Sequence, residues 1–256
     1  MRSDGTFAYH EQERDEALIR THLTRKGELR SHAAGHHLVG GFNRRVLMLA
    51  ASRRMIEEIT HSPKDAPIGV YRATDLAIQL NAYYLNLCGA LDNLAWVMQY
   101  EWDVLPGVTE TANGRHKCGL FSRPFMAALL RVRPAIAEAL ETHRSWYRNL
   151  RDLRDPGSHR VPLFAIPGYL TKEDAIEFNR LQHRAGERGE AGDHQGMMEY
   201  IHEASRLGGY APLMSVWTPH GETLVDAWQS VVRDHHQFQT VAQRVSAELF
   251  PVPRMG

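Results

Sequence analysis

An arginine and a histidine stand close together in the segment Arg154-Asp155-Pro156-Gly157-Ser158-His159, and this pair is the strongest chemical signal in the chain. The planar guanidinium of arginine suits a phosphate, because it can donate two parallel hydrogen bonds to it. Histidine can transfer a proton near neutral pH. A turn at Pro156-Gly157 would let both side chains reach one place. The segment therefore predicts chemistry on a phosphodiester, and RNA is the substrate that we expect.

The pattern of arginine followed by histidine after four to six residues is weak by itself. It occurs five times in this sequence, which is about what chance gives for 26 arginines and 15 histidines. Two further features distinguish Arg154. It alone among the five is followed directly by Asp, Asn or His, and it lies where a long predicted helix ends in a turn.

The surroundings of this pair are basic, although the formal net charge of the whole chain is zero. Residues 123–160 contain eight arginines and four acidic residues, whereas residues 172–203 contain four basic and eight acidic ones. RNA contact is therefore expected in the first segment, with Arg148, Arg151 and Arg160 as binding residues. The alternative is a solvated helix with salt bridges, in a chain whose 26 arginines against 4 lysines reflect genomic composition.

Composition indicates an ordinary globular protein of 256 residues, 43% of them hydrophobic and 23% charged. No apolar run approaches the length of a membrane span, and the N-terminal residues are polar rather than signal-like. The two cysteines are too few for a disulfide framework, which favours a cytoplasmic location. We therefore expect no membrane contact.

Hydrophobic periodicity predicts five long helices, at residues 10–33, 42–61, 72–103, 123–152 and 222–249. The helix at 72–103 is the clearest, because apolar residues recur in it every three or four positions: Leu76, Leu80, Tyr84, Leu87, Leu91, Leu94 and Met98. Pro134 should kink or split the fourth helix, and Asp155-Pro156-Gly157 should end it.

The remaining segments predict shorter elements. Polar loops are expected at 107–121 and in the glycine-rich stretch 186–196, and strands at 161–166 and 212–218. Thr171 should cap one further helix, and another should cover 195–207. The predicted fold is all-α: a bundle of four to six helices in a single domain, 1–256, with a β-hairpin-like excursion at 161–221 between the last two bundle helices.

The arginine–histidine segment at the end of a bundle helix resembles the signature of the HEPN superfamily. That signature is an arginine, usually followed by Asn, His or Asp, with a histidine a few residues later. The wider context from Leu150 to Leu163 is similar to a group of bacterial HEPN-like proteins, as is the upstream stretch Ala90-Leu91-Asp92-Asn93-Leu94-Ala95-Trp96. The likeness covers roughly residues 40–165. One departure is Pro156-Gly157, which lies inside the motif.

The resemblance implies a helical fold, dimerisation and, in many members, metal-independent RNA cleavage in toxin–antitoxin, anti-phage or RNA-processing systems. A protein partner such as an antitoxin is a further expectation. Carried over to this sequence, Arg154 and His159 become the catalytic pair, and Asp155 takes the variable polar position. Asp155 would orient one of the pair or serve as a turn residue, and Ser158 would touch phosphate or belong to the turn.

Asp92 and Asn93 stand in the middle of the predicted helix at 72–103, where polar residues carry a propensity cost. They are expected either to line the cleft or, as the favoured alternative, to have a structural role, with Asp92 paired to a nearby arginine.

The chemistry itself needs neither metal nor cofactor, because RNA carries its own nucleophile, the ribose 2′-hydroxyl. Histidine would transfer the proton, and arginine would stabilise the charge that develops on the phosphorane. One histidine cannot be both base and acid in a single step, so the nuclease hypothesis requires a homodimer with two pairs in one cleft. The products would carry 2′,3′-cyclic phosphate and 5′-hydroxyl ends. The alternative function is a non-catalytic helical module that binds RNA, a nucleotide or a protein.

Other histidines give weaker signals. His32, His36 and His37 have a spacing that could hold zinc, but no cysteine or carboxylate nearby completes the set, so we expect surface histidines. His235 and His236 on the last predicted helix have no partner that the sequence indicates.

Overall fold

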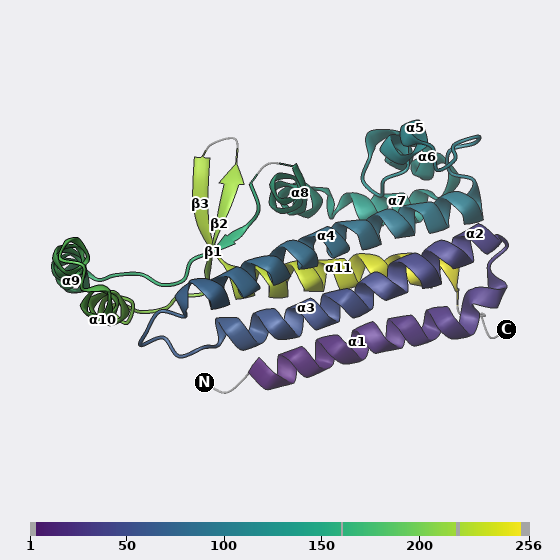
Figure 1. Ribbon diagram of the computed structural model, residues 1–256. Helices are drawn as coiled ribbons and strands as arrows, with labels where there is room; N and C mark the ends of the chain where they lie inside the picture. Colours follow the sequence, from purple (N-terminus) through teal and green to yellow (C-terminus); the bar gives the residue numbers. More distant parts are fainter. Residues whose placement is uncertain (1–3, 160, 219–220, 252–256) are drawn as a thin grey trace. The chain divides into compact units, whose positions relative to one another are not determined.

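The structure, a computed structural model, is mostly helical and contains one small antiparallel sheet (Figure 1). It describes residues 4–159, 161–218 and 221–251; for residues 4–10, 156–159 and 218 it describes the backbone alone. The predicted fold class, an all-α bundle with a short β excursion, is confirmed. In the described part of the chain, no helix is both long and apolar enough to cross a membrane.

The chain groups into two compact units. The first comprises Met1–Arg53, Asn81–Arg160 and Val231–Gly256, and the second comprises Arg54–Leu80 and Val161–Ser230. The second unit therefore holds the predicted excursion together with parts of three helices that continue into the first. The residues of the candidate site that the structure describes all belong to the first unit.

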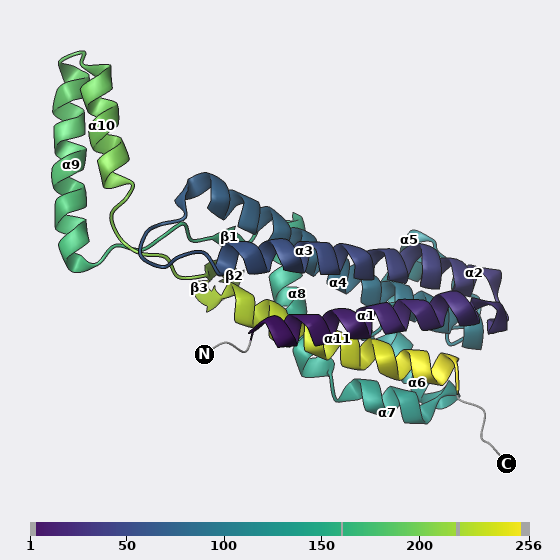
Figure 2. The same cartoon turned by 90° about the horizontal axis from the view of Figure 1, so that it is seen from below.

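Four long helices run side by side in the bundle: α1 (Asp4–Arg25), α3 (Arg44–Thr60), α4 (Gly69–Trp102) and α11 (Ala227–Leu249) (Figures 1 and 2). The apolar stripe predicted for the third helix is buried along α4 at every position: Leu76, Leu80, Tyr84, Leu87, Leu91, Leu94 and Met98. Periodicity thus identified the central helix of the core.

The first helix ends earlier than predicted, and the second begins earlier, because a carboxylate of α4 binds the backbone between them. α1 ends at Arg25 and is followed by a short 3-10 turn, rather than continuing to residue 33. Glu101 accepts hydrogen bonds from the backbone nitrogens of Arg30, at 2.5 Å, and Ser31, at 3.0 Å, which holds the chain in a break. The next helix starts at His32, ten residues before the prediction, as α2 (His32–Gly35) and a π-helix, η2 (His36–Asn43), that lead into α3.

The fourth predicted helix, 123–152, is three helices: α6 (Arg123–Val132), α7 (Pro134–Glu141) and α8 (Arg144–His159). The split at Pro134 is confirmed, and a second break at Thr142 was not predicted. There the Thr142 hydroxyl donates to the carbonyl of Ala139 at 2.8 Å, and the His143 ring bonds the side chain of Gln237 on α11 at 2.8 Å. A side-chain bond back to the helix and a tertiary contact therefore decide this break.

The prediction that Asp155-Pro156-Gly157 ends the helix is wrong, because α8 continues through all three residues to His159. Arg151 and Asp155 form an ion pair across the preceding turn, which favours the helical backbone there. Arg154 and His159 therefore belong to one helix, and the turn that was expected to lie between them is not formed. In Figure 1, α8 is seen along its axis while α4 and α11 lie in the plane of the view, so α8 crosses these helices.

The sheet of the second unit has the strand order β1 (Phe164–Ala165), β2 (Leu213–Thr218), β3 (Gly221–Asp226), with antiparallel pairing throughout. The two predicted strands are found, although the first is only two residues long. The third strand lies where the last helix was predicted to begin. β3 pairs with β2 from Leu213↔Asp226 to Thr218↔Gly221, so tertiary pairing overrides the helical periodicity, and α11 starts only at Ala227.

A helical hairpin, α9 (Lys172–Glu190) and α10 (His194–Ala204), completes the second unit (Figure 2). The predicted cap is confirmed: the Thr171 hydroxyl accepts from the backbone nitrogen of Asp174 at 3.1 Å, and the Asp174 carboxylate accepts in return. The loop predicted at 186–196 is wrong, because the helices leave only Ala191–Asp193 as a turn. The loop predicted at 107–121 likewise contains a short helix, α5 (Ala112–Lys117).

Candidate functional site

Arg154 lies on the last turns of α8 and shares a carboxylate with a second arginine. Its Nη1 donates to Asp155 Oδ1 at 2.9 Å, while Arg151 donates to Asp155 Oδ2 through Nη2 at 2.7 Å and Nε at 3.1 Å. Burial raises the pKa of Asp155, but the hydrogen bonds from Arg154 and Arg151 outweigh it and hold that pKa below its ordinary value. Asp155 is therefore the anion that fixes both guanidiniums.

Asp92 of α4 is a second carboxylate within electrostatic reach of these arginines, in a different environment. Burial is the dominant effect and raises the pKa of Asp92, although Arg154, Arg45 and Arg151 each act in the opposite direction. The structure thus places on one side of α4 a carboxyl group that favours its protonated form more than an exposed aspartate does. Arg154 therefore lies within electrostatic reach of Asp92, which the sequence had left either in the cleft or paired with an arginine.

Apolar and weakly acidic groups surround Asp92. Burial, with the charge of Asp92 next in importance, raises the pKa of Cys88 and of Cys118 to about 12, so both thiols are protonated and inert at neutral pH. Tyr147 of α8 is affected in the same way, and its pKa is raised above the ordinary value. The thiols and the phenol near these arginines are therefore uncharged at neutral pH and do not compete with a phosphate for them.

Asn93, the neighbour of Asp92 in sequence, belongs to a different network. Its Oδ1 accepts from Arg45 Nε at 3.2 Å, and its Nδ2 lies 3.3 Å from Nδ1 of His37. The same arginine donates to Asn86 at 3.0 Å. Asn93 therefore ties α3 and the π-helix to α4, which is a structural role.

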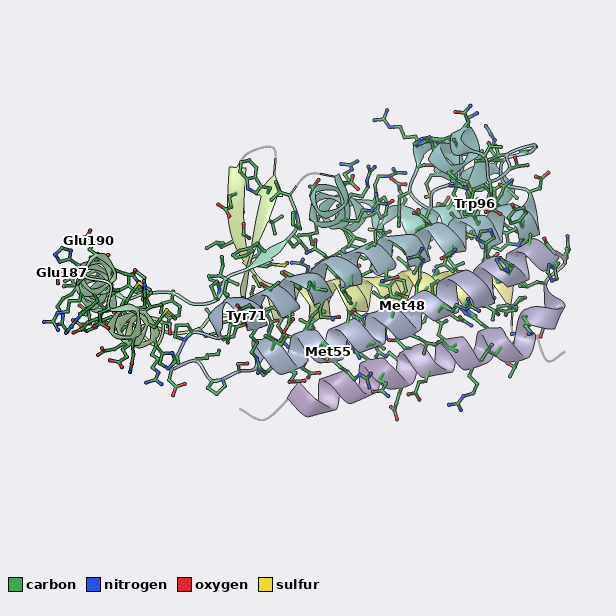
Figure 3. The ribbon with its side chains drawn as sticks, in the orientation of Figure 1. Met48, Met55, Tyr71, Trp96, Glu187 and Glu190 are labelled. Atoms are coloured by element: carbon green, nitrogen blue, oxygen red, sulfur yellow. The ribbon has the colours of Figure 1, made fainter. Side chains whose placement is uncertain are left out.

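His37 of the π-helix has partners that the sequence did not indicate. Its Nε2 lies 3.0 Å from Glu110, and its ring stacks on Trp96 and Tyr100, with centroid distances of 5.9 and 5.6 Å (Trp96 is labelled in Figure 3). The side chain is only 11% exposed, so the expectation of a surface histidine is wrong for His37. It holds for His32 and His36, which are exposed.

His235 also has partners, contrary to the sequence-based expectation. Its Nε2 lies 3.0 Å from Asp15 of α1, and its Nδ1 lies 3.3 Å from the hydroxyl of Tyr83. The His235 side chain is 1% exposed, so this network serves the core rather than a substrate. Among the described residues, no group of three His, Cys, Asp or Glu side chains could hold a metal ion.

The predicted RNA-binding arginines differ in how they are placed. Arg148 is exposed and lines a groove, and Arg151 is 56% exposed while it pairs with Asp155. Arg160 lies outside the described residues, as do the side chains of Ser158 and His159. Arg148, Arg151 and Arg154 recur every three residues along α8, so they follow one side of this helix.

Comparison of the chain with protein-family models, with curated proteins and with solved structures gave no match.

Proposed function

We propose that this protein is a metal-independent endoribonuclease that cleaves RNA through attack of the ribose 2′-hydroxyl. The observation that carries the proposal is the gathering of Arg151 and Arg154 around Asp155, within electrostatic reach of the half-buried Asp92. Arg151 and Arg154 share direct contact with a single carboxylate, and two adjacent guanidiniums are an arrangement that suits one phosphate. The resemblance to the HEPN signature adds the histidine, His159.

In the proposed reaction, His159 accepts the proton of the 2′-hydroxyl, and the 2′-oxygen attacks the adjacent phosphorus. Arg154 stabilises the charge on the phosphorane, and a second protonated histidine gives its proton to the departing 5′-oxygen. The histidine contributes about 10²–10⁴-fold to the rate, and the arginine a few kcal/mol. A homodimer supplies the second histidine.

Asp155 affects how tightly Arg154 can bind a phosphate. Its lowered pKa keeps it ionised at neutral pH, so a substrate phosphate competes with it for the guanidinium of Arg154. Arg151 can retain Asp155 when Arg154 turns to the substrate, because it reaches the other carboxylate oxygen. Asp155 is therefore a positioning residue in this proposal.

A non-catalytic module that binds RNA, a nucleotide or a protein is the second candidate function. The observation that favours it is the same ion-pair cluster, since Arg151 and Arg154 held by Asp155 are also what a structural tie within α8 looks like. Binding without cleavage would be the outcome.

The test is incubation of a labelled single-stranded RNA with purified protein in a chelator. We expect cleavage that leaves 2′,3′-cyclic phosphate ends, and no cleavage of the same RNA carrying 2′-O-methyl groups. Arg154→Ala and His159→Ala should each lower the rate by about 10²-fold or more. Arg131→Ala, which removes an exposed arginine of α6, is the matched control and should cleave normally.

Circular dichroism must show that each variant is folded. If the wild-type protein binds RNA but leaves it intact, the second candidate function is correct. If both variants cleave as fast as Arg131→Ala, the proposed site is wrong whatever the activity of the protein.

A further inference from the structure

A groove of about 520 Å³ lies beside the arginines of α8, between that helix and helices α6 and α7. Its volume is within the range of sites for single small ligands. Arg148, which the sequence already indicated as an RNA-binding residue, lines it. The groove therefore adjoins the candidate site along α8 and is large enough for one nucleotide.

The floor of the groove is apolar. Leu130 is 49% exposed on α6 and lines the groove together with the buried Met126. Ala127 and Ala137 are also in the lining, and their small side chains keep the floor open. Such a surface suits the flat, weakly polar face of a nucleobase.

The rim of the groove carries three arginines, and one of them is already paired with a carboxylate. Arg144 donates two hydrogen bonds to the carboxylate of Glu141, one of them from Nη2 to Oε2 at 2.8 Å. This ion pair neutralises the charge of Glu141. Arg123 and Arg148 are exposed. Glu138 is the opposing charge, so the rim retains a net positive charge of one.

The spacing along α8 connects the groove to the candidate site. Arg148 and Arg154 are six residues apart, which is about 9 Å along the helix axis. A strand whose phosphate is held at Arg154 can therefore place a neighbouring nucleotide in the groove. A duplex cannot, because its bases are stacked inside and do not reach a floor of this size.

We propose that the α6–α7–α8 groove binds one unpaired nucleotide of single-stranded RNA, its base on Leu130 and Met126 and its phosphate at Arg123 and Arg148. This rests on the proposed function, because it takes RNA as the substrate. It adds that the substrate is single-stranded next to the scissile linkage, and that the groove contributes to the choice of cleavage position.

The experiment measures binding of a labelled 12-nucleotide single-stranded RNA to the full chain, in chelator, over a range of salt concentrations. Leu130→Ser removes the apolar floor, so we expect about 5- to 50-fold weaker binding with an unchanged salt dependence. Arg148→Ala removes a phosphate contact, and the slope of log K against log salt should fall by about 0.7. Arg131→Ala and a duplex of the same sequence are the controls.

The two variants have different signatures, and this separates the groove from the nuclease proposal. If both behave like Arg131→Ala while the RNA is still cleaved, the groove proposal is overturned and the nuclease stands. If both show their expected signatures but the RNA is never cleaved, the groove stands and the nuclease fails. Equal affinity of the wild-type protein for the duplex would also overturn the groove proposal.

Discussion

Two aspartates near Arg154 show how environment rather than residue type sets the charge of a side chain. Asp155 has two guanidiniums in direct contact, and its pKa is lowered although burial acts against this. Asp92 feels arginines only at longer range, and burial raises its pKa. One carboxylate therefore strengthens the fold when ionised, and the other weakens it.

Replacing Asp92 by asparagine should stabilise the protein at neutral pH. The folded pKa of Asp92 lies above that of the unfolded chain, about 3.9. The folded protein therefore binds the proton more tightly, and stability is lost as the pH rises from that value through the raised folded pKa. Asp92→Asn lacks this loss, so its free energy of unfolding should exceed that of the wild type by on the order of 1 kcal/mol at pH 7.

Urea unfolding at several pH values measures this difference. The advantage of Asp92→Asn should shrink toward pH 4 and disappear below it. Asp152→Asn, which alters an exposed aspartate of α8, should show no such trend. A destabilised Asp92→Asn at pH 7 would mean that the arginines outweigh burial.

At the scale of single elements, the π-helix η2 brings His37 into contact with Asn93 of α4. A π-helix has i→i+5 hydrogen bonds in place of the i→i+4 bonds of an α-helix, and such segments are rare and frequently lie at functional sites. Gly41 makes this one possible, because a Cβ at Gly41 would collide with the amide of Asn93. That amide cannot move freely, since it is held by Arg45 and His37.

Gly41→Ala should therefore destabilise the protein by about 1–3 kcal/mol. Gly35→Ala is the matched control: nothing lies within 4 Å of its Cβ, and its backbone is helical at φ −59°. There the substitution should stabilise by up to about 1 kcal/mol, because alanine loses less backbone entropy than glycine. Thermal unfolding compares the two, and equal effects would contradict the role given to Asn93.

At the scale of the whole molecule, His22 makes the stability of the bundle depend on pH. Its Nδ1 lies 2.8 Å from Asn43 Oδ1 and its Nε2 lies 3.1 Å from the hydroxyl of Ser246, so it joins α1, the π-helix and α11. Burial lowers the pKa of His22, and the hydrogen bond to Asn43 compensates only in part. The unfolded chain therefore takes up the proton first as the pH falls below about 6.5.

The wild-type protein should lose on the order of 1 kcal/mol of unfolding free energy between pH 7 and pH 5 through this group. His22→Gln should be less stable at pH 7, because its bonds are lost, but its stability should vary less over this range. His183→Gln, at a side chain that is 80% exposed, is the control for a general effect of histidine. Urea unfolding curves at each pH decide the matter, and parallel curves for His22→Gln and wild type would contradict it.

Subunit mixing tests the dimer that the proposed reaction requires. Sedimentation should give about twice the mass of one chain. When inactive Arg154→Ala/His159→Ala subunits are added in excess and allowed to exchange, the activity per wild-type subunit should fall, because each mixed dimer retains only one histidine. Activity per wild-type subunit that stays constant over the mixing series would show that one chain carries a complete site.

The sequence by itself determined the helical class, the buried stripe of α4, the split at Pro134 and the cap at Thr171, because periodicity, proline and capping act through neighbours along the chain. It left open whether Asp155 orients one of the pair or belongs to a turn, and the structure shows Asp155 in an ion pair with its sequence neighbour Arg154. Tertiary contacts decided the rest. Pairing with β2 turned residues 221–226 into a strand, and contact between His143 and Gln237 helped break the helix at Thr142.

Only the tertiary structure could set Asp92 among three arginines, or give His37 and His235 their carboxylate partners, 73 and 220 residues away. Nothing in local sequence records which distant helix will face a side chain. The free energy that places it there comes from burial of the whole core.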